Sequence, residues 1–259
     1  GLEVVVVGAG RMGREHSAAI AAAGDKVVAF LDPDLDRALS AATSLGAQAA
    51  AVGPDLGPAL EPFVSAGASA VLIASPSALH LAHTEAALAF GLPVLLEKPP
   101  WVPGQDPARL LAAKSSGAVI AVGMTTRFNL GVQAVRRAVQ SGAIGTVVTI
   151  SDRVAFTLVP GDLGEWYFDG ERSGGGVLVT NGVHSLDRLA WVLGQPLHLV
   201  SARLSSEYLQ SCEDTAVLEL SAGAIAVHVV ELWGPGPVPP SELVVIGTRG
   251  TCWADADGN

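Results

Sequence analysis

The sequence is short of positive charge, cysteine and long apolar runs, and each shortage excludes a class of function. Its 259 residues carry a formal net charge of −10 and have a pI near 4.9. Nucleic acid and anionic membranes attract basic surfaces, so neither is an expected partner. No run approaches the roughly 18 consecutive apolar residues that a membrane-spanning helix requires, so no membrane association is predicted.

Cysteine and lysine are also scarce. Cys212 and Cys252 lie far apart without a CxxC partner, which argues against a disulfide framework and against a zinc or other metal site. Free thiols favour a reducing compartment, and we expect a cytoplasmic protein. Lys26, Lys98 and Lys114 are the only lysines in the sequence. A lysine at any constrained position is therefore a candidate for a specific role.

The first half of the sequence alternates β-branched apolar runs with Ala-rich segments of helical spacing. Buried parallel strands read as continuous apolar runs, and parallel neighbours need a helical crossover. Residues 1–123 are therefore predicted to form a doubly wound α/β domain. We expect strands at 3–8, 26–31, 47–52, 69–75, 93–97 and 118–123, and helices at about 11–23, 34–45, 55–65, 78–90 and 106–116.

The rhythm changes after Gly123, and residues 124–259 are predicted to form a second, α+β domain for substrate binding and oligomerisation. Short turns between successive apolar runs, such as "SAG" within "TAVLELSAGAIAVHVVELW", are typical of hairpins and predict an open, mostly antiparallel sheet. We expect helices at about 129–141 and 181–193, and strands at 146–156, 197–207, 213–221, 224–233, 241–247 and 251–255.

"VVVVGAGRMG" has the strand–glycine–helix arrangement of a dinucleotide-binding loop. Such glycines permit a tight turn and close approach to a pyrophosphate, while the helix N-terminus offers N–H groups to it. Asp32 ends the next strand, where a carboxylate binds the adenosine ribose and repels a 2′-phosphate. This favours NAD, although Arg37 nearby leaves NADP possible; the alternative is a Gly-rich turn with a surface aspartate. The predicted cofactor contacts here are Gly8, Gly10, Arg11, Met12, Gly13 and Asp32.

Two further strand ends supply polar residues at the same edge of the sheet. Ser75 ends one strand and Pro76 follows it, and His80, on the next helix, either faces the cofactor or packs within the domain. Glu97 ends another strand and Lys98 follows it, and the proline after Lys98 holds that lysine extended. Lys98 then projects toward a nicotinamide, or it is a surface lysine paired with Glu97. We include all five among the predicted cofactor contacts, and interpret His16, His198 and His228 as structural.

Several motifs together resemble the Gfo/Idh/MocA oxidoreductases over about residues 3–250. The shared motifs, in order, are Gly8–Gly13, "SPSALH", "EKP" at 97–99, "RF" at 127–128 and "GGGVLVTNGVHSLDRLAWVLG" at 174–194. The resemblance implies a Rossmann domain followed by a domain with an open sheet, and NAD(P)-dependent oxidation or reduction of a sugar or cyclitol hydroxyl. It implies that Lys98 is the active-site lysine and that His184 is the acid/base histidine. Family members usually continue with another helix and strand, so a shortened member or a piece of a longer chain is expected.

One position departs from the family pattern. Many members have an aspartate four residues before the histidine, where it can orient the imidazole or share its proton. Here that position is Thr180, which can hydrogen-bond but cannot carry charge. We expect Thr180, Asn181 and His184 to contact the substrate. Three functions remain open: a dehydrogenase, an enzyme that cleaves a glycosidic bond through transient oxidation, and a dinucleotide-binding regulatory protein.

The remaining candidates are two charged residues and an aromatic loop. Arg127 could hold a substrate carboxylate or a cofactor phosphate. Asp187 either orients the ring of His184 or pairs on the helix surface with Arg188 or Arg153. The loop 159–176 carries aromatics suited to a polyhydroxylated ring, or to core packing instead. Its predicted substrate contacts are Trp166 and Tyr167, set among Asp162, Glu165, Asp169 and Arg172. The open sheet suggests a homo-oligomer.

Overall fold

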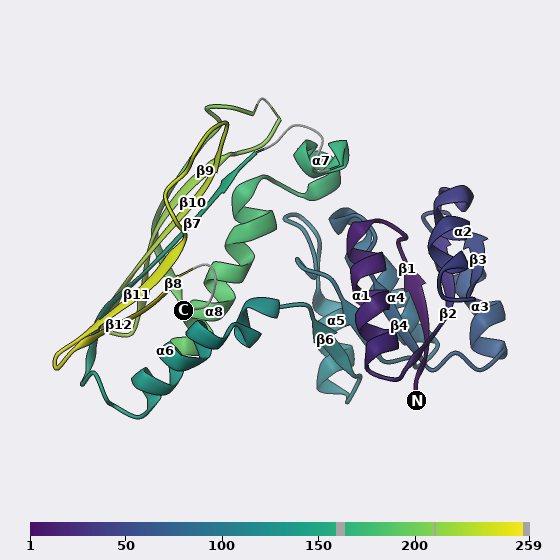
Figure 1. Cartoon of the computed structure of the whole chain (residues 1–259), viewed down its shortest axis with the longest axis horizontal. Helices are drawn as coiled ribbons and strands as arrows, with labels where there is room; N and C mark the ends of the chain where they lie inside the picture. Colours follow the sequence, from purple (N-terminus) through teal and green to yellow (C-terminus); the bar gives the residue numbers. More distant parts are fainter. Residues whose placement is uncertain (159–163, 210, 256–259) are drawn as a thin grey trace. The chain divides into compact units, whose positions relative to one another are not determined.

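The computed structural model describes residues 1–158, 164–209 and 211–255. The chain divides into two compact units, Gly1–Gly123 and Met124–Asn259. Figure 1 follows the chain through both units, and each unit is described by itself below.

The first unit is built on a six-stranded parallel sheet with the order β3-β2-β1-β4-β5-β6. Its strands are β1 (Glu3–Val7), β2 (Lys26–Asp32), β3 (Gln48–Ala51), β4 (Ala70–Ile73), β5 (Val94–Leu96) and β6 (Ile120–Val122). Its helices are α1 (Arg11–Ala22), α2 (Leu35–Thr43), α3 (Gly57–Ser65), α4 (His80–Ala89) and α5 (Ala108–Ser115), with a 3-10 turn η1 (Ser77–Leu79) before α4. The strand order reverses between β1 and β4, where doubly wound folds bind their ligands.

Helices cover both faces of this sheet, which explains the continuous apolar runs of its strands. On one face, Val4, Val6 and Phe30 pack with alanines of α2 and with Ile20 of α1. On the other face, Val5 and Val7 pack with apolar residues of α3 and α4. Every residue of a central strand therefore meets a helix, whichever way it points.

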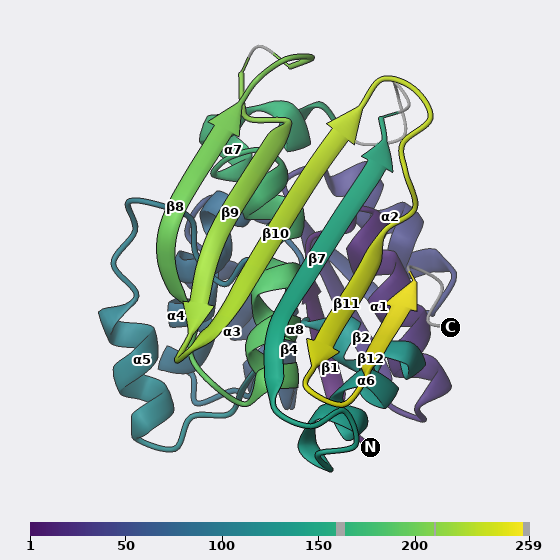
Figure 2. The ribbon, with the colours of Figure 1, turned by 90° about the vertical axis from the view of Figure 1, so that its left-hand side faces the viewer.

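The second unit contains a six-stranded mixed sheet with the order β12-β11-β7-β10-β9-β8 (Figure 2). Only β7 and β10 pair in parallel, and the other neighbours are antiparallel. This agrees with the predicted fold class. The strands are β7 (Val147–Thr157), β8 (His198–Ser205), β9 (Thr215–Ala222), β10 (Ile225–Gly234), β11 (Glu242–Gly247) and β12 (Thr251–Asp255).

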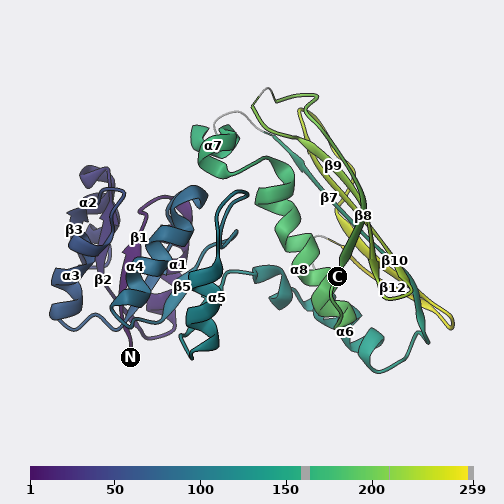
Figure 3. The ribbon, with the colours of Figure 1, turned by 180° about the vertical axis from the view of Figure 1, so that it is seen from behind.

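Helices of this unit lie on one face of the sheet, as the views in Figures 2 and 3 agree. They are α6 (Leu130–Gln140), α7 (Gly170–Ser173) and α8 (Val183–Leu193), with a π-helical turn η4 (Leu178–Gly182) leading into α8 and 3-10 turns η2 (Thr125–Phe128) and η3 (Glu165–Phe168). Burial alternates along β10: Val227 and Val229 are buried against the helices, while His228 and Val230 point to the outer face.

Candidate functional site

The three glycines of the loop between β1 and α1 differ in what a side chain would meet at each position. Gly8 has φ +100°, and a Cβ there would lie 2.4 Å from the Ala74 carbonyl oxygen at the end of β4. A Cβ on Gly13 would lie 1.9 Å from the Gly8 carbonyl oxygen, whereas one on Gly10 would meet nothing within 4 Å. Gly10 precedes α1 and supplies no side-chain cap, so a bound phosphate can accept the first N–H groups of the helix. The loop therefore fits a dinucleotide pyrophosphate.

Asp32 fixes the glycine loop in addition to its predicted role toward a ribose. It is only 3% exposed, and its Oδ2 accepts the N–H of Ala9 at 2.8 Å while Oδ1 accepts the N–H of Asp34 at 2.9 Å. The Arg37 guanidinium lies 3.7 Å from Oδ1 and 3.1 Å from the Asp34 carboxylate. Each carboxylate oxygen has a second lone pair, so Asp32 retains acceptor capacity for ribose hydroxyls.

Ser75 and His80 form a buried network beside the end of β4. The two ring nitrogens of His80 lie 2.8 Å from the Ser75 carbonyl oxygen and 2.6 Å from that of Pro99. His83 contacts the Ser75 hydroxyl at 3.0 Å. Burial lowers the pKa of His80 although both carbonyls oppose that effect. This geometry fits the packing role for His80, and a cofactor contact by its ring remains a prediction.

Lys98 follows β5 at the carboxyl edge of the sheet, and Glu97 connects it to α1. The Glu97 carboxylate accepts the Lys98 backbone N–H through Oε2 at 3.0 Å, and its Oε1 lies 2.5 Å from His16 Nε2. The sequence alone indicates only a structural role for His16. It does not predict the contact between His16 and Glu97. The available signal was its spacing of three from Gly13, which puts His16 on the same face of α1.

The electrostatics of this group are coupled. The Lys98 pKa is lowered because burial disfavours the ammonium; Glu97 partly offsets this, and Arg11 adds to it. The hydrogen bond to Glu97 raises the pKa of His16 against the effect of burial. Burial alone would raise the pKa of Glu97, but the contacts with His16 and Lys98 hold it below its usual value. A lysine with a lowered pKa at such an edge is a candidate for acid–base chemistry.

His184 lies in the first turn of α8, and the π-helical turn before it is tied to the sheet. Thr180 is buried, and its hydroxyl donates to the Gly176 carbonyl at 2.7 Å and lies 3.2 Å from Asn181 Oδ1. Asn181 Oδ1 also accepts the Trp233 indole N–H at 3.0 Å. Both polar groups therefore brace the helix, and their predicted contacts with a substrate remain predictions. Local π-helical turns are frequent at functional sites.

The glycine run 174–176, before this helix, contacts the carboxylate of Glu213, which lies just before β9. Glu213 accepts the N–H groups of Gly176 and Leu178 at 2.8 and 3.1 Å, and a Cβ on Gly176 would lie 1.8 Å from its carbonyl oxygen. The absence of a side chain at Gly176 therefore lets the backbone lie against Glu213. The carboxylate satisfies N–H groups at the start of the helix and complements its dipole.

Arg127 forms a two-pronged ion pair with Asp187. Nε and Nη2 of Arg127 donate to the Asp187 carboxylate at 2.7 and 2.5 Å, which raises the pKa of Arg127. The suggested pairing of Asp187 with Arg188 or Arg153 is wrong, because Arg188 binds Asp152 and Arg153 binds Glu242. The fold brings η2 rather than a neighbouring turn of α8 to Asp187. A role for Arg127 toward a cofactor remains a prediction.

The aromatic residues of η3 pack against the sheet. Tyr167 and Phe168 lie 5.5 and 5.9 Å from the Trp233 ring, and Trp166 meets Tyr167 edge to face at 5.5 Å. The core-packing alternative therefore describes Tyr167, and its contact with a substrate remains a prediction, as does that of Trp166. Asp162, which the same prediction included, lies outside the described residues.

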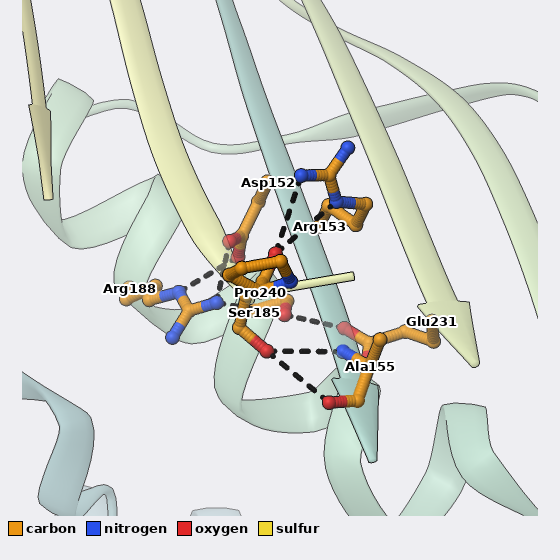
Figure 4. A network of polar contacts seen from close by, with 8 residues as sticks. Asp152, Arg153, Ala155, Ser185, Arg188, Glu231 and Pro240 are labelled. Atoms are coloured by element: carbon orange, nitrogen blue, oxygen red, sulfur yellow. Dashed lines mark hydrogen bonds and ion pairs between the residues drawn. The ribbon is translucent and has the colours of Figure 1, made fainter. Parts of the chain in front are cut away.

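A buried polar network lies beneath α8 (Figure 4). Glu231 of β10 is fully buried and accepts a hydrogen bond from the Ser185 hydroxyl, and Arg188 forms a two-pronged ion pair with Asp152 of β7. Burial raises the pKa of Glu231 to about 8, the Ser185 hydrogen bond opposes this rise, and Asp152 adds to it. Sequence alternation in "AVHVVELW" places Glu231 on the inner face, which was a signal for its burial.

Comparison with known proteins matches both halves of the chain to one family. Residues 2–139 match the oxidoreductase family with an NAD-binding Rossmann fold named GFO/IDH/MocA, and residues 132–253 match the GFO/IDH/MocA C-terminal domain. The chain belongs to this family. The resemblance indicated by the sequence motifs is confirmed, and the model that matches the N-terminal half describes an oxidoreductase family with an NAD-binding Rossmann fold.

Two curated relatives are dehydrogenases of polyhydroxylated compounds. Inositol 2-dehydrogenase 3 of Saccharopolyspora erythraea is 28% identical over 86% of this chain and 64% of its own length. D-glucoside 3-dehydrogenase of Escherichia coli is 32% identical over 75% of this chain and 55% of its own length. The chain thus spans between half and two thirds of the length of these relatives.

Solved structures of similar fold include two that were determined with a dinucleotide. The WlbA dehydrogenase from Bordetella pertussis, in complex with NADH and UDP-GlcNAcA, has a TM-score of 0.88 at 24% identity, covering 99% of this chain and 74% of its own. GenD2 from gentamicin A biosynthesis, in complex with NAD, has a TM-score of 0.84 at 26% identity, covering 98% and 72%. Across the described residues, no helix combines the length and apolar character needed to cross a membrane.

Proposed function

We propose that this chain binds NAD and interconverts a hydroxyl and a keto group on a sugar, cyclitol or related polyol, acting as a dehydrogenase or reductase on CH–OH groups. NADP remains possible because Arg37 lies beside Asp32. The proposal is supported by family membership and by the inositol and glucoside dehydrogenases among the relatives. Bound NAD supplies the redox chemistry, accepting or returning the hydride and its two electrons.

The observation that carries the proposal is the position of Lys98. It stands at the carboxyl edge of the parallel sheet, next to the glycine loop, with a pKa lowered by burial. An ammonium there stabilises the oxyanion that develops as a carbinol loses its proton. In the oxidation direction, His184 takes the hydroxyl proton, and Lys98 holds the oxygen.

The test is turnover with a panel of polyols, glycosides and amino sugars, followed as NADH absorbance. Lys98→Met and His184→Ala should lower kcat by roughly two to four orders of magnitude, the usual range for an acid–base group, while NADH affinity is retained. Lys114→Met and His198→Ala are the matched controls, since both residues are exposed and lie outside the site. Unchanged turnover in the first two variants would reject the assigned roles.

One observation favours a second candidate, a dinucleotide-binding regulatory protein. Thr180 stands where many family members carry an aspartate, and its hydroxyl donates a hydrogen bond to the Gly176 carbonyl. A threonine cannot supply the carboxylate that those members place one turn before the histidine. NADH binding without turnover across the whole panel would favour this candidate. Release of sugar from a glycoside without net change in NADH would instead indicate glycosidic cleavage.

We also propose that the outer face of the second sheet joins copies of the chain, and that the protein is cytoplasmic. Trp253 of β12 is 67% exposed, and the neighbouring Val244 and exposed Ile246 of β11 also face outward. Exposed apolar patches of this kind mark association surfaces. Cys212 and Cys252 are free thiols, which fits a reducing compartment. Trp253→Glu should shift the molar mass measured by light scattering toward the monomer.

A further inference from the structure

The His16–Glu97 pair joins the helix of the glycine loop to the strand end that carries Lys98. We propose that His16 and Glu97 are positioning residues that hold the Lys98 segment and set the charge state of the Lys98 ammonium. This inference rests on the proposed function, because it assigns a task to the neighbours of the proposed catalytic lysine.

Glu97 is held from three sides. Its backbone N–H donates to the Ile73 carbonyl at 2.8 Å, Oε2 accepts the Lys98 N–H, and Oε1 faces His16. A Cβ on Gly123 would lie 3.4 Å from Oε1, so the strand beside it leaves little room for the carboxylate to move. A carboxylate held in this way also holds the backbone N–H of Lys98.

The pair is also nearly removed from solvent. The side chains of His16 and Glu97 are 18% and 8% exposed. Charges out of water are weakly screened, so each acts strongly on its neighbours. The groups that act on Lys98 or on this pair are Glu97 itself, Arg11, Glu15 and His16 of α1, and His80 of α4. Glu97 favours the Lys98 ammonium, and Arg11 opposes it.

The second unit offers a matched control. His228 Nδ1 lies 2.6 Å from Glu219 on the outer face of the other sheet, with the two side chains 44% and 47% exposed. It is the same chemical contact in a solvated place, where ion pairs contribute little. His228→Gln and Glu219→Gln therefore control for the loss of a His–Glu contact as such.

The experiment is a pH titration of protein labelled with ¹³C at the lysine ε-carbons. Only three lysines are present, so each resonance is resolved and Lys98→Met assigns it. We expect Lys98 to titrate below the usual range of a lysine ammonium. Glu97→Gln keeps the shape but removes the charge, and should lower the Lys98 pKa by about one unit. Glu219→Gln should leave it unchanged.

His16 provides a second, independent result. As pH rises through the raised pKa of His16, the pair changes from neutral to negative, and the Lys98 resonance should show an inflection above pH 6.5. His16→Gln retains a donor for Glu97 but abolishes that inflection. The proposal is overturned if the Lys98 resonance is the same in both variants and only their melting temperature changes. The His16–Glu97 contact would then have a structural role alone.

The titration needs neither cofactor nor substrate, so it separates this inference from the proposed function. If turnover is found, the basic limb of kcat against pH should move to lower pH in Glu97→Gln. If no substrate turns over but the Lys98 resonance responds as described, the dehydrogenase proposal fails and the positioning role stands.

Discussion

The two sheets place their buried polar side chains in different positions. In the first unit, Asp32, Ser75 and Glu97 lie where strands end, at the carboxyl edge of the parallel sheet. In the second unit, Asp152 and Glu231 lie within strands, beneath the helix that carries His184. Polar groups at the edge of a sheet can contact a ligand that binds there, whereas polar groups beneath a helix contact the side chains of that helix. Under the proposed function the first set serves a ligand, whereas the second set holds a helix in place.

The largest expected effects come from the two glycines where a Cβ would collide with backbone. Gly13→Ala and Gly176→Ala each demand a backbone shift, because the new carbon would lie 1.9 and 1.8 Å from a carbonyl oxygen. We expect each to cost more than about 4 kcal/mol of unfolding free energy in its own unit. Denaturant unfolding measures this, and Gly10→Ala, which meets open space, is the control; equal stability of all three would contradict the prediction.

Breaking the ion pair beneath α8 should cost nearly as much. Arg188→Ala leaves the Asp152 carboxylate buried without its partner, and we expect a loss of about 3–5 kcal/mol. Arg153→Ala removes the neighbouring Arg153–Glu242 pair on the exposed face and should cost no more than about 1 kcal/mol. Thermal or urea unfolding compares the two variants. Similar losses would mean that burial does not distinguish them.

Glu231 should make the stability of the second unit depend on pH. Its pKa is about 8 in the folded chain against 4.5 for an ordinary glutamate, so the folded state keeps a proton that the unfolded state releases. Stability is therefore lost as pH rises between these two values, by an amount on the order of a few kcal/mol. In Glu231→Gln this loss should be absent. Parallel unfolding curves for both proteins from pH 5 to pH 8 would exclude the assignment.

The smallest effect concerns Thr180. Thr180→Val keeps the shape but removes the hydrogen bond to Gly176, and should cost about 1 kcal/mol of unfolding free energy. If bracing is its whole task, kcat and KM stay near those of the parent under conditions where both proteins are folded. A large rise in KM would show instead that the hydroxyl also contacts substrate.

Local patterns were sufficient for the elements and the cofactor loop. The predicted helix at 11–23 is α1 at Arg11–Ala22, and the predicted strand at 251–255 is β12. Apolar period and glycine spacing act over a few residues and survive in any fold. The predicted helix start at 181 falls within the π-helical turn at Leu178–Gly182. This turn precedes α8, and its first N–H group, that of Leu178, donates to the Glu213 carboxylate from a later segment.

The sequence by itself determined the alternation of strands and helices, the two kinds of sheet, the glycine loop and the position of Lys98 at a strand end. Only the tertiary structure decided which polar groups meet. His16 and Glu97 are 81 residues apart, Arg127 and Asp187 are 60 apart, and Ser185 and Glu231 are 46 apart. Periodicity carries information over one or two turns, whereas these pairings depend on how crossovers and hairpins return the chain to the same sheet.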